Sequence, residues 1–220
     1  MSSNARTAFD ENVKDIDKLL LLHAAEGGDQ PGRRYGLEVL NKSAIVLITS
    51  FWESYCEDIA EEALEAIVQH APNSDVLPKE IKKVIAKTLK EDKNEIAIWE
   101  ISDDKWRAVL RKNFVALKTE RNKTFATPKS FNVNQLFESA VGLADVSSNW
   151  KWEKMSTTQA ANKLNGFVAK RGDIAHRGSS TSTVKKSEVV AYLNHVKKLA
   201  AKTGGAVNRH VKTITGQALW

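Results

Sequence analysis

Apolar residues recur at intervals of three and four along most of the chain, a spacing that predicts helices instead of strands. The longest such stretch covers about residues 35–71, where the apolar positions predict one buried helix face. A helix over residues 5–25 is expected before it, because glycine and proline cluster at residues 27–32. The sequence contains no internal repeat and no alternating run of useful strand length.

Shorter helices are expected in the middle of the chain. Pro78 suits the first turn of a helix that extends to Lys90. The acidic pair at residues 103–104 suits the start of another helix, because carboxylates are favoured near a helix N-terminus. Residues 119–132 are polar and include a proline, which predicts a long exposed loop, and a helix over residues 133–143 follows it.

A further helix carries the most unusual run of residues in the chain. Ser156 and Gln159 form the capping-box pattern at its start, and the helix runs towards Arg171. Gly178 and the small polar residues 179–182 predict a flexible break after it.

The last helix is expected over residues 185–202, because two glycines follow at residues 204–205. Residues 206–220 are expected to form a basic tail or a short extra helix. Helices of ordinary length with mostly short connections predict an all-α fold, an antiparallel helical bundle. We expect a single domain over residues 1–220, with its core over about residues 35–203.

The composition is typical of a soluble cytoplasmic protein. Cys56 is the only cysteine, which excludes a disulfide framework and a cysteine-rich zinc site. Residues 1–10 lack the apolar core of a signal peptide. The longest apolar run, at about residues 44–49, is too short to cross a bilayer, so no membrane partner is expected.

Charge is distributed unevenly along the chain. Residues 1–100 carry 12 Lys and Arg against 19 Asp and Glu, whereas residues 101–220 carry 21 against 8. A basic half favours an anionic partner, of which the phosphate backbone of nucleic acid is the commonest. The alternative is an ordinary solvated basic surface.

The run from Lys170 to Gly178 combines a permanent cation, Arg171, with a group that titrates near neutrality, His176. On a straight helix these two residues lie about 140° apart, so they do not share one face. They can form a site if the helix ends within the run, or if a second copy of the chain supplies the complementary group. The alternative is a helix C-terminus at which His176 contacts the last carbonyl groups.

The residues around this run resemble a known family in several places. The run itself resembles the Arg-x4-His signature of the HEPN superfamily. Upstream, residues 45–58 resemble the long acidic and aromatic helix of the RiboL-PSP-HEPN group, and residues 131–137 and the pair Trp150 and Trp152 resemble its middle segment. The resemblance implies a HEPN-type helical bundle, with extra helices between the second helix and the motif helix, that forms a homodimer.

The resemblance also implies a function. Many HEPN proteins are metal-independent endoribonucleases that act as toxins or in antiviral defence, and others are catalytically inactive modules that bind RNA or proteins. We therefore expect an RNA-cleaving enzyme without metal or cofactor, with RNA as its partner; a cognate antitoxin or regulatory protein is a further partner to consider. A DNA-binding regulator is a third alternative, although no recognition-helix pattern supports it. Gly178 stands where a toxin subgroup has a tyrosine that its antitoxin nucleotidylates, which argues against that subgroup.

The expected roles follow from the chemistry of the side chains. His176 can transfer protons to and from the ribose 2′-oxygen or the leaving oxygen, and Arg171 can hold the scissile phosphate. Asp173 is a candidate to orient one of them. Lys170 and Arg177 are expected to guide the RNA backbone, with ordinary solvated cations as the alternative.

Two other groups of residues each allow two interpretations. The second helix carries a carboxylate cluster that either contacts the motif or forms a solvated acidic face. Several tryptophans either stack bases or pack in the core. The remaining histidines are too scattered for a metal site. The carboxylates are Glu57, Asp58, Glu61 and Glu62; the tryptophans are Trp52, Trp99, Trp106, Trp150 and Trp152; the histidines are His23, His70, His195 and His210.

Overall fold

A computed structural model describes residues 2–27, 36–123, 125, 127–177 and 183–220. Within this part of the chain, seven α-helices follow one another: α1 (Asn4–Gly27), α2 (Glu38–His70), α3 (Lys79–Lys90), α4 (Trp106–Lys123), α5 (Ser130–Val141), α6 (Thr157–Arg177) and α7 (Lys186–Thr215). Four short 3-10 helices lie between them: η1 (Ser74–Val76), η2 (Ala97–Ile101), η3 (Asp103–Lys105) and η4 (Val146–Asn149). The described residues form no strand beyond an isolated bridge between Trp152 and Met155, so the all-α prediction is confirmed.

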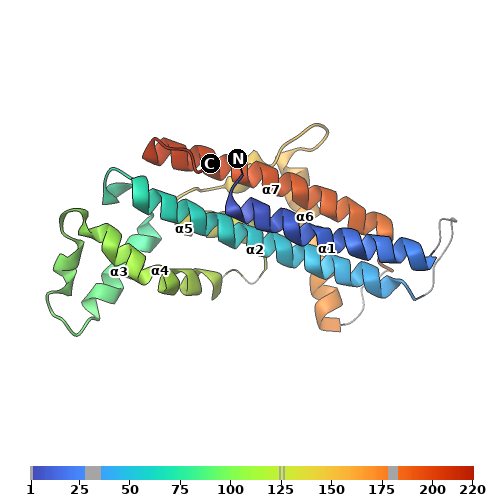
Figure 1. Cartoon of the computed structure of the whole chain (residues 1–220), viewed down its shortest axis with the longest axis horizontal. Coiled ribbons are helices and arrows are strands. Elements are labelled where there is room, and N and C mark those ends of the chain that lie inside the picture. The colour runs from blue at the N-terminus through green and yellow to red at the C-terminus, as the bar shows by residue number, and fades with distance from the viewer. Residues whose placement is uncertain (1, 28–35, 124, 126, 178–182) are drawn as a thin grey trace.

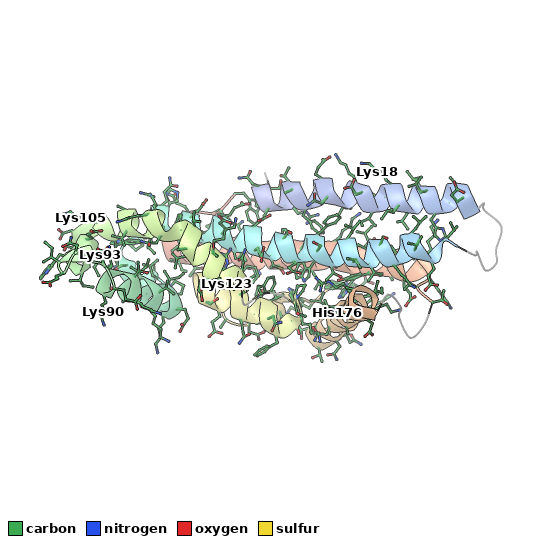
Figure 2. All side chains as sticks on the ribbon, turned by 90° about the horizontal axis from the view of Figure 1, so that it is seen from below. Lys18, Lys90, Lys93, Lys105, Lys123 and His176 are labelled. Atoms are coloured by element: carbon green, nitrogen blue, oxygen red, sulfur yellow. The ribbon has the colours of Figure 1, made fainter. Side chains whose placement is uncertain are left out.

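Helix α2 is the centre of the molecule. It packs against α1, α4, α5, α6 and α7, and buried residues occur along its whole length. Figure 1 shows α1, α2 and α7 side by side along the long axis, with α3 and α4 forming a lobe at one end. In Figure 2, α1 lies on one side of α2, and α6 lies on the opposite side.

Buried aromatic side chains join α2 to the rest of the bundle. Trp52 packs edge-on against Trp150, and both are fully buried. The indole N–H of Trp52 donates to the carbonyl of Pro128 (3.2 Å), and the hydroxyl of Tyr55 donates to the carbonyl of Ala200 in α7 (2.8 Å). The Trp52 indole N–H and the Tyr55 hydroxyl are thus both hydrogen-bonded, so these large aromatic side chains are buried without an unpaired donor.

The prediction of a long exposed loop over residues 119–132 is wrong. Helix α4 continues to Lys123 and α5 begins at Ser130, so only residues 124–129 lie between them. Phe125 and Pro128 in this connection are buried. The polar residues 119–123 form the last turn of α4, and their composition reflects helix exposure to solvent instead of a loop.

The prediction that Gly204 and Gly205 end the last helix is also wrong. Helix α7 runs through both glycines to Thr215, so residues 206–220 are not a tail. A Cβ on Gly204 would lie 2.6 Å from the hydroxyl oxygen of Tyr55, and the ring of Trp220 packs on the same position. The glycine is present because α2 and α7 approach closely here, a tertiary requirement that the sequence pattern does not reveal.

The two glycines supply a matched test of this close approach. We expect Gly204→Ala to lower the free energy of unfolding by about 1–3 kcal/mol, because the buried Tyr55 hydroxyl is held by its hydrogen bond and cannot yield freely. Gly205→Ala places its Cβ 3.5 Å from an Arg209 nitrogen, an ordinary contact. It should be neutral or stabilise the helix by up to about 1 kcal/mol. Urea unfolding measures both changes, and equal effects of the two substitutions would contradict the packing argument.

Candidate functional site

The motif helix α6 begins with the predicted capping box. The backbone N–H of Ser156 donates to the side-chain oxygen of Gln159 (2.9 Å), and the N–H of Gln159 donates to the Ser156 hydroxyl (3.3 Å). This reciprocal pair satisfies two donors that the first turn of a helix leaves unpaired. The helix then buries Ala160, Leu164 and Val168, so its apolar side faces its own bundle.

Helix α6 remains unbroken through the motif. It ends at Arg177, so the alternative in which the helix ends between Arg171 and His176 is wrong. The two side chains therefore stay about 140° apart around one straight helix. A single copy of the chain presents them in different directions.

The Arg171 side chain lies at the contact between α6 and α2. Its Nη2 atom is 3.6 Å from Oε2 of Glu53, a separation that makes an ion pair without a hydrogen bond. The two side chains are 25% and 22% exposed, respectively. The buried Nε of Arg171 has no hydrogen-bond partner in the described structure. An arginine that is a quarter exposed, and that its carboxylate partner holds without a hydrogen bond, can bind an oxyanion.

Two partly or fully buried titratable groups lie beside the Arg171 guanidinium. Burial raises the pKa of the Glu53 carboxyl, and the charge of Arg171 offsets only part of that effect. Burial also raises the pKa of Tyr192 on α7, whose hydroxyl is hydrogen-bonded to the Thr49 hydroxyl (2.9 Å). Arg171 is close enough to Tyr192 to oppose that rise. The guanidinium thus lies where α2, α6 and α7 meet.

His176 lies on the solvent side of the same helix and is exposed (Figure 2). Asp173 is half-buried and precedes it by three residues, so the two side chains are neighbours on α6. Asp173 and Arg171 point in nearly opposite directions around the helix, because two residues span about 200°. Of the two orienting roles predicted for Asp173, the one towards His176 fits the geometry better.

Lys170 and Arg177 are the two residues predicted to guide the RNA backbone. The Lys170 ammonium is ion-paired with Glu188 on α7. Burial alone raises the pKa of Glu188, but the hydrogen bonds from Lys170 and from the Lys185 backbone, together with their charges, lower it overall. Arg177 is the last residue of α6, and its side chain lies outside the described residues. Gly178 and residues 179–182 also lie outside them.

The apolar residues next to the motif belong to the core of this chain. By residue type, Phe167, Val168 and Ile174 are also candidates for a contact between two copies of the chain. Val168 and Ile174 are buried, and Phe167 stacks on Tyr192 with ring centroids 4.2 Å apart. Their apolar character serves the packing of α6 on its own bundle.

Two carboxylates of the α2 cluster make structural contacts with other helices. The residue that pairs with the motif is Glu53, one turn before the cluster. Glu61 pairs with Lys118 of α4 (2.5 Å), and Glu62 accepts hydrogen bonds from the first backbone N–H groups of α1. Burial raises the pKa values of Glu57 and Asp58. Glu53 lies outside the predicted cluster, although its position between two buried aromatic residues of α2 is a signal that could have identified it.

The other histidines have packing roles where the structure defines them. His195 is buried, its Nε2 lies 3.0 Å from the Ala160 carbonyl oxygen, and burial lowers its pKa to about 4. His210 Nε2 lies 2.8 Å from the carbonyl oxygen of Val141. Among the described residues, no group of three or more His, Cys, Asp or Glu side chains is arranged to hold a metal ion. Trp52, Trp106 and Trp150 are buried, whereas Trp99 is exposed.

The Glu53 contact can be tested through the pH dependence of stability. Because folding raises the pKa of Glu53, its charged form costs stability at neutral pH, and this cost disappears as the pH falls through the folded-state pKa. We expect Glu53→Gln to leave the free energy of unfolding unchanged or raised near pH 7, with the difference from wild type shrinking towards about pH 4. Urea unfolding at several pH values measures this difference.

Glu65→Gln, at an exposed position of the same helix, is the matched control for the loss of one carboxylate. A Glu53→Gln protein that is strongly destabilised near neutral pH would contradict the interpretation. Such a result would mean that the ion pair with Arg171 stabilises the fold by more than the burial of Glu53 costs.

Comparison with known proteins identifies a family for this chain but no individual relative. No curated protein and no solved structure matches the chain. No helix in the described ranges combines the length and apolar character that a membrane span requires. The sequence model of the RiboL-PSP-HEPN family matches residues 10–208, a span that includes Glu53, Arg171 and His176. A match of this extent also favours an RNA-related function. The chain belongs to the RiboL-PSP-HEPN family.

Proposed function

We propose that this protein is a metal-independent endoribonuclease, a toxin or antiviral-defence effector of the cytoplasm, with its site shared between two copies of the chain. The observation that carries the proposal is the state of Arg171. Its guanidinium is held beside Glu53 with Nε unpartnered, on the same helix that exposes His176. These are the two groups that cleavage at a phosphodiester requires when the ribose 2′-oxygen is the nucleophile.

The reaction assigns one role to each group. His176 removes the proton of the 2′-hydroxyl, and the 2′-oxygen attacks the adjacent phosphorus. The bond from phosphorus to the 5′-oxygen breaks, and that oxygen takes a proton from a second, protonated imidazole. Arg171 stabilises the charge that develops on the phosphate oxygens. Glu53 acts as a positioning residue, because it holds the guanidinium at the contact of α2 and α6.

Two copies of the chain fit this reaction better than one. One helix directs Arg171 towards α2 and His176 towards solvent, about 140° apart. A two-fold axis beside α6 would bring both motifs to one groove and supply the second imidazole. It would also concentrate the basic second halves of two chains around the RNA.

Cleavage assays with RNA test the proposal directly. We expect the protein to cut RNA in EDTA, to leave 2′,3′-cyclic phosphate ends, and to leave DNA uncut because it lacks the 2′-hydroxyl. His176→Ala should lower the cleavage rate by about 10²–10⁴-fold and leave RNA affinity within a few-fold, since general acid–base catalysis contributes that much. Arg171→Ala should lower both the rate and the affinity, because it removes a phosphate contact.

His70→Ala, at the exposed end of α2, is the matched control and should cleave at the wild-type rate. Loss of activity in EDTA with recovery in Mg²⁺ would contradict the metal-free mechanism. Wild-type cleavage by both motif variants would show that Arg171 and His176 are structural. RNA binding without any cleavage by the wild type would identify a catalytically inactive RNA-binding module.

A further inference from the structure

An aromatic side chain close to the motif helix is mostly exposed in its own chain. Phe131, in the first turn of α5, is 67% exposed. The other apolar residues of α5 behave differently, since all of them are buried in the bundle: Val133, Leu136, Phe137, Ala140 and Val141. An exposed phenylalanine offers a flat apolar face, which suits contact with a ligand.

The start of α5 is fixed to the motif helix by hydrogen bonds. The backbone N–H of Ser130 donates to the Asn165 side-chain oxygen (2.9 Å), and the Asn165 amide nitrogen donates to the Ser130 hydroxyl (3.1 Å). Just before it, the carbonyl of the buried Pro128 accepts from Trp52. Phe131 therefore stands at a defined place beside α6.

That place is on the face of α6 that carries His176. Asn165 and His176 are eleven residues apart, which is about 20° from three full turns and about 16 Å along the helix axis. Ala169 lies between them on the same face and is exposed, and a Cβ added to Gly172 would have nothing within 4 Å. Figure 2 shows α6, with His176 labelled, and the yellow start of α5 on the same side of α2. The surface between Phe131 and His176 thus carries only short side chains along α6.

We infer that Phe131 stacks on an unpaired base of the RNA whose backbone passes His176, a few nucleotides from the bond that is cut. The inference rests on the proposed function and adds a base-binding subsite to it. Stacking on an aromatic ring tolerates every base, because each base has a π-face. The exposed Lys129, two residues away, adds a positive charge beside the ring for the neighbouring phosphates. The subsite therefore selects single-stranded RNA, since a base in a duplex cannot leave its stack without cost.

Binding and kinetic measurements on three variants test this subsite. In a His176→Ala background, which prevents cleavage, Phe131→Ala should raise the Kd for a labelled single-stranded oligoribonucleotide by about five-fold or more, whereas Phe131→Trp should retain the affinity. With His176 intact, Phe131→Ala should raise KM by a similar factor and leave kcat within two-fold, because α5 is bonded to α6 at Asn165, about 16 Å along the helix axis from His176. Ile96→Ala is the matched control. Ile96 is 67% exposed, as Phe131 is, and lies directly before η2 in the α3–α4 lobe, so its replacement should leave Kd and KM unchanged.

A scan with one abasic nucleotide locates the contact along the RNA. In the wild type, one position near the cleaved bond should be sensitive to loss of its base, and Phe131→Ala should abolish that sensitivity. Wild-type affinity of Phe131→Ala would overturn the inference. So would a fall in molecular mass on Phe131→Ala, which would place the ring in an interface between copies. If the wild type binds RNA without cutting it, the proposed function fails, but weaker binding by Phe131→Ala still supports the subsite.

Discussion

A single turn of α2 fixes both the core and the candidate site. Thr49 is hydrogen-bonded to Tyr192 of α7, Trp52 to the carbonyl of Pro128 before α5, and Glu53 is paired with Arg171 of α6. Residues 49–53 of α2 therefore contact three parts of the chain that are distant in the sequence: α7, the residues just before α5, and α6. The position of Arg171 depends on this turn, and the start of α5 that carries Phe131 depends on it as well.

The ion pair of Arg171 and Glu53 serves position more than stability. The pKa of Glu53 is raised, so the cost of burying its charge exceeds the attraction of Arg171. The pair lacks a hydrogen bond, and the Nε of Arg171 lacks a partner. A fold selected for stability alone would satisfy these groups or replace them by apolar ones. In the proposed function, this cost is offset because the Arg171 guanidinium binds the phosphate.

The sequence predicts the elements well and their tertiary roles poorly. The spacing of apolar residues gives α1 and α2 nearly to their ends, and Ser156 with Gln159 gives the start of α6, because these signals are local. The wrong predictions at Gly204 and at residues 119–132 share one cause. Glycine and proline usually interrupt helices, but Gly204 lets α7 approach Tyr55 of α2, and Phe125 and Pro128 pack in the core.

The candidate site shows the same division. Arg171 and His176 stand out by residue type, but Glu53 is identified only when α2 and α6 are packed together. The 140° separation of Arg171 and His176 follows from helix geometry, and the structure adds that α6 continues through both. The proposed function therefore requires a second copy of the chain to complete the site.

The most direct test of that requirement is the molecular mass in solution, measured by light scattering, together with the specific activity on RNA over the same dilution series. We expect a dimer at micromolar concentration and a specific activity that falls as the dimer dissociates. A monomer that retains full specific activity on dilution would contradict this expectation.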